Sequence, residues 1–141
     1  MKFLISFFNP TFSPYNKKKL FLGKLDFISN FCASKKVKVF NFLQPDLFFK
    51  EKKSKFEKSY CEFQGEQREK FCLKKYIEFE EKFFDRKYDT SYLKNISLLR
   101  CFDKYEETIF FDRSHTADKG YEIIAKKISD VVAENIINTR I

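Results

Sequence analysis

The one histidine of this 141-residue chain, His115, follows Asp112 by three positions in the stretch FFDRSHTADKGYEIIAKKI, residues 110–128. A tight turn can bring a carboxylate and an imidazole with this spacing into contact. A carboxylate bound to Nδ1–H fixes the tautomer of the ring, so that Nε2 can take a proton from a serine or cysteine. The pair is therefore a candidate acid–base pair, although D-x-x-H spacing on its own also arises often by chance.

Two expected elements would position this pair. The segment ETIFFD, residues 107–112, is typical of a short strand that ends at Asp112. Asp118 can cap a following helix. One face of that helix is apolar and carries Ile124, Ile128, Val131 and Val132. We therefore expect His115 in a loop between a strand end and a helix start, where the active sites of α/β sheets collect.

The remaining segments predict further helices and one strand. Residues 17–34 have helical apolar spacing, and KVKVFNFLQP at 36–45 is typical of a buried strand. Residues 50–84 predict two helices, or one kinked helix, divided at Gly65, and residues 88–103 a short helix. The stripe of residues 50–84 that we expect to face the core consists of Phe56, Tyr60, Phe63, Cys72, Tyr76, Phe79 and Phe83.

We expect residues 1–16 to be irregular, with MKFLISFF at their start as a short strand or a frayed terminus. This apolar run is too short for a signal peptide or a membrane span. Strands separated by helices predict an α/β fold with a parallel sheet covered on both faces. Two strands are too few for such a sheet. The sequence therefore predicts that residues 1–141 form a single, incomplete α/β domain.

The net charge of +8 raises the question of an anionic partner. The basic residues are almost all lysines that are scattered along the chain, a pattern typical of a solvated surface. Arginines, which read bases by bidentate contacts, number only five, so no specific nucleic-acid partner is predicted. A non-enzymatic module that binds nucleic acid or an anionic membrane surface stays open as an alternative.

The four cysteines do not predict a metal site. They stand at positions 32, 61, 72 and 101, no two of them are separated by two residues, and one histidine cannot complete a zinc set. We expect reduced thiols, buried at Cys32, Cys61 and Cys72, as is usual in the cytoplasm. No cofactor is predicted.

The stretch 110–128 resembles the last conserved block of the SGNH (GDSL-type) hydrolases, in which D-x-x-H is followed by a Gly and an Ile-Ile-Ala-type helix. Asp112 and His115 match the family's catalytic acid and base. Gly120 matches the Gly that lets the helix pack close to the loop. FNFLQPDLFF at 40–49 is similar to a strand that ends in Gln-Pro before a helical insertion in some members.

This resemblance implies a flavodoxin-like α/β/α domain of three layers, with residues 50–84 as the insertion and 107–137 as the terminal block. It also implies hydrolysis of a small-molecule, lipid or carbohydrate acyl ester. A serine would attack the carbonyl, His115 would take its proton as general base, and Asp112 would orient His115. Residues 50–84 would form a surface helical pair or a lid over the site.

The chain departs from the family at the nucleophile. It has no Gly-Asp-Ser motif, and none of its ten serines follows a glycine. The oxyanion glycine and asparagine are missing as well. Three explanations are consistent with this: a carboxyl-terminal fragment, a decayed relative, or one half of a split enzyme. We expect the chain alone to be inactive, and a helical interaction protein built on residues 50–84 is a further alternative.

Overall fold

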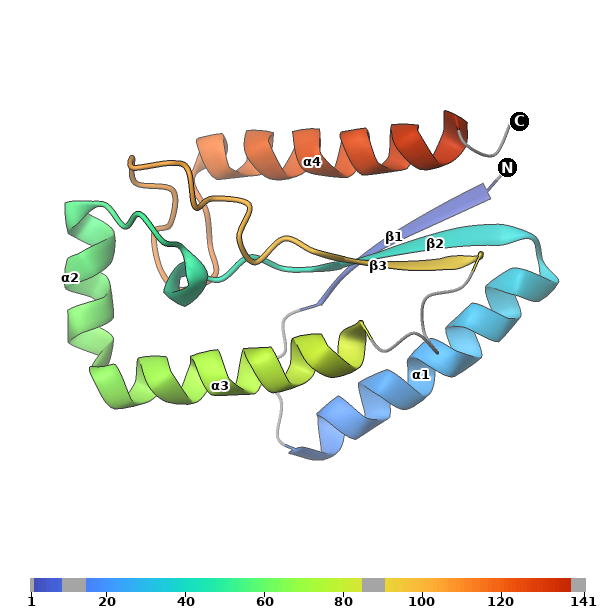
Figure 1. Ribbon diagram of the computed structural model, residues 1–141, viewed down its shortest axis with the longest axis horizontal. Coiled ribbons are helices and arrows are strands. Elements are labelled where there is room, and N and C mark those ends of the chain that lie inside the picture. Colours follow the sequence, from blue (N-terminus) through green and yellow to red (C-terminus); the bar gives the residue numbers. More distant parts are fainter. Residues whose placement is uncertain (1, 9–14, 85–90, 138–141) are drawn as a thin grey trace. The chain divides into compact units, whose positions relative to one another are not determined.

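The computed structural model describes residues 2–8, 15–84 and 91–137 (Figure 1). In chain order the elements are β1 (Lys2–Phe8), α1 (Tyr15–Ser34), β2 (Val37–Leu43), the 3₁₀ helix η2 (Leu47–Phe49), α2 (Lys55–Gln64), α3 (Glu66–Phe83), β3 (Leu93–Ser97) and α4 (Asp118–Ile137). They form two compact units, one of Met1–Gln44 and Gln67–Ser97, the other of Pro45–Glu66 and Leu98–Ile141. The predicted α/β class is confirmed.

The first unit contains a parallel sheet with the strand order β1-β2-β3. Ile5 is the register partner of Phe40, and Phe42 is that of Ile96. Parallel neighbours need a crossover between them, which α1 supplies between β1 and β2. The strands follow one another across the sheet in the order in which they occur in the chain.

Helices α1 and α3 cover the same face of this sheet (Figure 1). Cys32 of α1 packs with Val39 and Leu93, which are neighbours in β2 and β3. Asn95, two positions after Leu93 and so on the same face, donates a hydrogen bond of 3.0 Å to the carbonyl of Phe83 at the end of α3. Side chains at alternate strand positions thus hold both helices.

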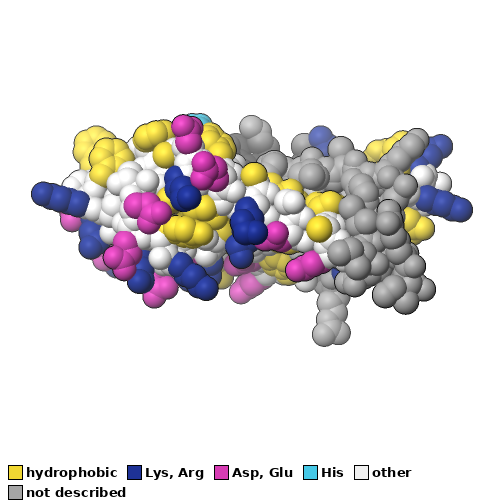
Figure 2. Space-filling view, turned by 90° about the horizontal axis from the view of Figure 1, so that it is seen from above, with side chains coloured by type: hydrophobic (Ala, Val, Ile, Leu, Met, Phe, Trp, Pro, Cys, Tyr) yellow, Lys and Arg dark blue, Asp and Glu magenta, His cyan; other side chains and the backbone are white. Residues whose placement is uncertain are grey.

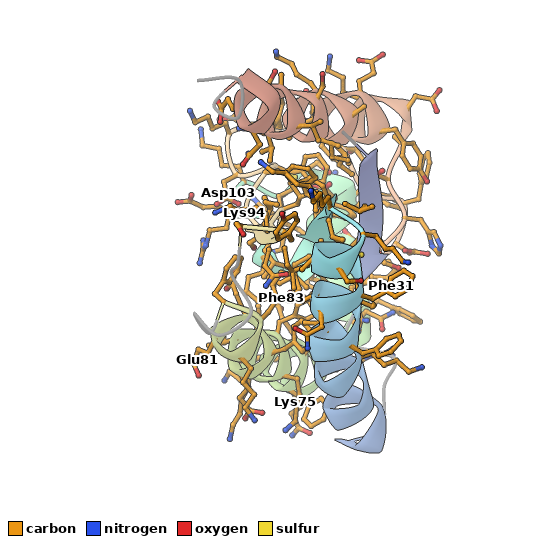
Figure 3. The ribbon with its side chains drawn as sticks, turned by 90° about the vertical axis from the view of Figure 1, so that its right-hand side faces the viewer. Phe31, Lys75, Glu81, Phe83, Lys94 and Asp103 are labelled. Carbon is orange, nitrogen blue, oxygen red and sulfur yellow. The ribbon has the colours of Figure 1, made fainter. Side chains whose placement is uncertain are left out.

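The division of residues 50–84 into two helices is confirmed. Gly65 ends α2 with φ at +82°, a left-handed value that glycine adopts without strain. The predicted core-facing stripe holds for α3, where Cys72, Tyr76, Phe79 and Phe83 are buried. Figure 3 shows Phe83 directed inward from α3 and Phe31 directed outward from α1.

The stripe is wrong for α2. Phe56 is 52% exposed and Phe63 is 85% exposed, whereas Glu57 and Cys61 are buried. The face of α2 that is buried is therefore the one that carries a carboxylate. The physical reason is that Glu57 has four donors for its two oxygens, as described below.

Three other predicted elements need correction. Residues 2–8 form the edge strand β1, so the irregular segment predicted at 1–16 is wrong there, and the short strand given as one alternative for MKFLISFF is confirmed. Residues 93–97, within the helix predicted at 88–103, form β3, because pairing with β2 outweighs their local helical preference. Residues 85–90 lie outside the described residues. The strand predicted at 107–112 is reduced to one antiparallel bridge between Phe110 and Thr116.

The second unit has its own core. The ring of Phe102 meets that of Phe110 edge to face at 5.3 Å, and both side chains are fully buried. Leu47, Leu98 and Ile109 are also buried. These residues lie in η2 and in the irregular segment after β3, so the core fixes a stretch of chain that has little regular structure. No helix in the described part of the chain is long and apolar enough to cross a membrane.

Candidate acid–base site

Asp112 and His115 lie in a short loop that is closed at its base by backbone pairing. Phe111 N–H donates to the carbonyl of His115 at 2.9 Å, and Ala117 N–H donates to that of Ile109 at 2.7 Å. The bridge between Phe110 and Thr116 lies between these two hydrogen bonds. The predicted strand-to-helix loop is therefore a hairpin-like loop that leads directly into α4.

The structure brings the two predicted residues into contact. His115 Nδ1 lies 2.7 Å from Asp112 Oδ2. The other carboxylate oxygen, Oδ1, accepts hydrogen bonds of 2.8 Å from the backbone N–H groups of Ser114 and His115. One carboxylate thus fixes both the turn and the ring. The side chain of His115 is 73% exposed, so Nε2 is accessible to solvent.

The charge of Asp112 is stabilised in this loop. Partial burial raises the pKa of its carboxyl, but the hydrogen bonds from the His115 ring and from the two backbone N–H groups outweigh that effect. The pKa lies below its usual value of 3.8 as a result. Asp112 is therefore an anion at neutral pH and an acceptor for Nδ1–H.

Arg113 anchors the loop to the segment around η2. Its Nε lies 3.0 Å from Oδ2 of the fully buried Asp46, and its carbonyl accepts a hydrogen bond of 2.9 Å from Leu47 N–H. The guanidinium also lies over the ring of Phe48, 5.8 Å from its centroid. The residue between Asp112 and Ser114 is thus bound through both its side chain and its backbone.

Glu57 of α2 holds the chain that enters the loop. Its Oε1 accepts hydrogen bonds of 2.9 and 3.0 Å from the N–H groups of Ile109 and Phe110. Its Oε2 lies 2.6 Å from Lys50 Nζ in a fully buried ion pair and also accepts from Ser54 N–H at 2.8 Å. In a sheet, the N–H groups of Ile109 and Phe110 would bind carbonyls of neighbouring strands. Here both bind the carboxylate of Glu57.

Lys50 completes the same network. Its ammonium also donates to the carbonyl of Glu107 at 2.7 Å. Burial raises the pKa of Glu57, but the hydrogen bonds from Lys50 and from the backbone of Ser54, Phe110 and Ile109 outweigh it and hold the pKa below 4.5. The network therefore consists of a charged pair whose oxygens are fully hydrogen-bonded, the condition under which burying such a pair is tolerated.

Gly120 lets the first turn of α4 pack against the loop. A Cβ atom at this position would lie 2.5 Å from Thr116 Cβ, closer than such atoms approach in proteins, and 3.0 Å from Ile109 Cγ2, a tight contact. Thr116 itself is buried. This close approach is the role that the resemblance implies for Gly120.

No nucleophile accompanies the pair in the described part of the chain. Neither a serine or threonine hydroxyl nor a cysteine thiol hydrogen-bonds to the His115 ring there. Ser114, which is next to His115 in sequence, binds Asp112 through its backbone N–H. Burial raises the pKa of Cys101 to about 12, so this thiol stays protonated. Among the residues described, no group of three or more His, Cys, Asp and Glu could hold a metal ion.

Sequence reasoning found Asp112, His115 and Gly120 but not Asp46, Lys50 and Glu57. One signal for Glu57 was present in the segment SKFE, because Ser followed three positions later by Glu is the sequence signature of a capping box. The structure contains that box, with Glu57 N–H bound to Ser54 Oγ at 3.3 Å. The bonds from Glu57 to Ile109 and Phe110 span more than fifty residues, and no local pattern indicates them.

Comparison with known proteins adds no relative: no protein-family model, no curated protein and no solved structure matches this chain. The resemblance of residues 110–128 to the SGNH hydrolases therefore rests on those residues alone.

Proposed function

We propose that Asp112 and His115 are the acid–base pair of an SGNH-type ester hydrolase site, carried by a chain that lacks a recognisable nucleophile. The main observation in support of this proposal is the 2.7 Å contact between His115 Nδ1 and Asp112 Oδ2, together with the exposure of the His115 side chain to solvent. Nδ1–H donates to the carboxylate, so the lone pair of Nε2 is available to take a proton from a hydroxyl group.

The surrounding structure supports the same reading. A base must keep its orientation while it transfers a proton, and here Asp112, Arg113 and the N–H groups held by Glu57 immobilise both ends of the loop. Gly120 brings α4 against the loop as the family pattern requires. The strand order β1-β2-β3 is also the order of the last three strands in the flavodoxin-like sequence 2-1-3-4-5.

The chain alone is expected to hydrolyse a p-nitrophenyl acyl ester no faster than free imidazole at the same concentration. An accessible imidazole supplies only that background, because a nucleophilic serine and oxyanion donors supply most of the rate in such enzymes. Turnover well above that background that His115→Ala abolishes would show that a nucleophile is present and would overturn the expected inactivity.

The decisive experiment starts from the DNA upstream of the Met1 codon. If an in-frame Gly-Asp-Ser segment is found there, the longer protein should hydrolyse the ester, and His115→Ala should lower kcat roughly 10⁴-fold or more. Lys58→Gln, an exposed change in α2, serves as the control. Full activity of the longer protein after His115→Ala would refute the proposed role of the pair. A stop codon at that point would instead favour the decayed relative.

A further inference from the structure

The second unit contains a pocket of about 470 Å³, lined by residues of α4 and of the segment 100–105. This volume lies within the range of small-molecule sites. None of the lining residues belongs to the loop that carries Asp112 and His115. The pocket is thus separate from the acid–base loop in the residues that form it.

Cationic side chains predominate in the lining. It includes five of them, Arg100, Lys104, Lys119, Lys126 and Lys127, against the two carboxylates Glu122 and Asp130. Figure 2, viewed from the side on which α4 is drawn in Figure 1, shows basic and acidic side chains interspersed around a hydrophobic patch. The coloured part of that face thus shows no continuous basic surface.

The two carboxylates already have cationic partners. Lys119 lies 3.3 Å from Glu122, and Lys126 lies 3.4 Å from Asp130. Within the described residues, Lys104 and Lys127 form no ion pair. Two of the lysines that line the pocket thus have no carboxylate partner, which favours a ligand that carries about two negative charges.

The remaining lining residues are uncharged. Ile123 is buried, and Cys101 and Tyr105 are half-buried. Burial raises the pKa of the Cys101 thiol, although Lys127 is close enough to lower it in part. A neutral thiol, an aliphatic side chain and a phenol ring suit an apolar or aromatic group better than a second charge.

We propose that this pocket binds a small phosphate monoester, with its phosphate between Lys104 and Lys127 and its organic group against Tyr105 and Ile123. A phosphate monoester carries nearly two negative charges at neutral pH, which matches the two unpaired ammonium groups. The site does not depend on the hydrolase assignment, because it shares no residue with the acid–base pair.

The test is a titration of the full chain with phenyl phosphate, followed by calorimetry and by the backbone NMR signals of residues 100–105 and 119–130. Binding should shift those signals and should weaken as salt is raised from about 50 to 500 mM, since the lysines are exposed. Phenol, which has the ring without the charge, should not bind measurably. Inorganic phosphate should bind more weakly than phenyl phosphate.

Variants separate the pocket from general surface charge. Lys104→Gln and Lys127→Gln should each weaken binding roughly threefold to tenfold, and the double variant should abolish it. Lys58→Gln, which removes an exposed lysine from α2, should leave binding unchanged. Lys127→Arg keeps the charge and should retain most of the affinity. Unfolding curves of each variant would show that the fold is preserved.

Three results would overturn the proposal. The first is the absence of binding at about 10 mM phenyl phosphate, far above the concentrations at which most small-molecule sites operate. The second is binding that the double variant retains or that Lys58→Gln weakens equally. The third is binding of a single-stranded oligonucleotide that requires Lys104 and Lys127, displaces phenyl phosphate and shifts NMR signals far outside the pocket. That result would assign the two lysines to a nucleic-acid surface.

Discussion

At the scale of single residues, the candidate site depends on one carboxylate that has two functions. Asp112 Oδ1 closes the turn by accepting two backbone N–H groups, and Oδ2 binds the ring of His115. The turn and the orientation of the His115 ring are thus determined by the same side chain. The two functions can be separated by a variant that still accepts the two backbone N–H groups but presents a donor to the His115 ring.

Asp112→Asn is such a variant. Its amide oxygen can still accept the two backbone N–H groups, but its NH₂ would face His115 Nδ1, so the ring should move its proton from Nδ1 to Nε2. Long-range ¹H–¹⁵N NMR at pH 8 would show this change directly, because the chain has only one histidine. Asp118→Asn, at the start of α4, is the control. The same tautomer in the wild type and in Asp112→Asn would contradict the assigned contact.

The same carboxylate makes stability depend on pH. Because the pKa of Asp112 is lowered in the folded state, its contribution is present above the unfolded value of about 4 and is lost as pH falls through the folded pKa. The stability advantage of the wild type over Asp112→Ala should therefore be larger at pH 7 than at pH 3. Urea unfolding at the two pH values measures the difference, and an equal advantage at both would contradict it.

Gly120 gives a second prediction at this scale. Gly120→Ala places a Cβ atom against Thr116 and Ile109, so the loop and the first turn of α4 must move apart. We expect a loss of roughly 1–3 kcal/mol in the free energy of unfolding, measured in urea. Gly23→Ala, where a Cβ atom would meet nothing within 4 Å, should be neutral or slightly stabilising. Equal effects at the two glycines would argue against the close approach.

At the scale of elements, α2 is part of the scaffold of the loop and is not only a surface helix. Its capping box places Glu57 on the first turn, and that carboxylate then binds the N–H groups of Ile109 and Phe110. Phe56 and Phe63 are left exposed as a result. An interpretation of α2 as a lid conflicts with this network, because opening would break the hydrogen bonds from Ile109 and Phe110 to Glu57 and disturb its buried ion pair with Lys50.

Glu57→Gln should be strongly destabilising. The amide would direct its NH₂ either at Lys50 and Ser54 N–H or at Ile109 and Phe110 N–H, so donors would face donors whichever way it turned. We expect a loss of roughly 3–5 kcal/mol in the free energy of unfolding at pH 7. The loss should shrink as pH falls below about 4.5, because the pKa of Glu57 is lowered only in the folded state.

Glu62→Gln is the matched control for this prediction. It makes the same change in the same helix at an exposed position and should alter stability by less than about 0.5 kcal/mol. A small effect of Glu57→Gln would mean that the buried network does not form in solution. The sharper readout is the His115 NMR signal of a folded Glu57→Gln sample, which should shift if Glu57 positions the loop.

At the scale of the whole molecule, the four cysteines test the packing of both units. None forms a disulfide, and Cys32, Cys61 and Cys72 are buried. Cys101 is half-buried, and its pKa is raised to about 12, mainly by burial. All four thiols should therefore react slowly in the native protein, for reasons that differ between Cys101 and the other three.

A thiol titration with Ellman's reagent at pH 8 measures this. We expect no fast-reacting thiol in the native chain and four in about 6 M guanidinium chloride, since only the thiolate is nucleophilic and burial limits access. One or more thiols that react at the rate of free cysteine would show that the corresponding unit opens readily. Alanine variants at each position would identify which one.

Local patterns predicted most helices and one strand correctly. The spacing of apolar residues indicated α1, α3 and α4, and the β-branched and aromatic run indicated β2. Predictions failed where a distant partner decided the outcome. Residues 93–97 form a strand because β2 lies beside them, and residues 107–112 do not because Glu57 takes two of their N–H groups.

The sequence by itself determined the contact between Asp112 and His115, because a spacing of three residues and a glycine five positions after the histidine are local constraints on a turn and a helix start. Only the tertiary structure decided what holds that turn. Asp46 forms an ion pair with the side chain of Arg113, and Glu57 accepts hydrogen bonds from the backbone of Ile109 and Phe110. In both cases the partners are more than fifty residues apart in the chain and become neighbours only after folding. The pocket lined by Lys104 and Lys127 has the same origin, since a scattered set of lysines becomes a site only where two segments of the chain meet.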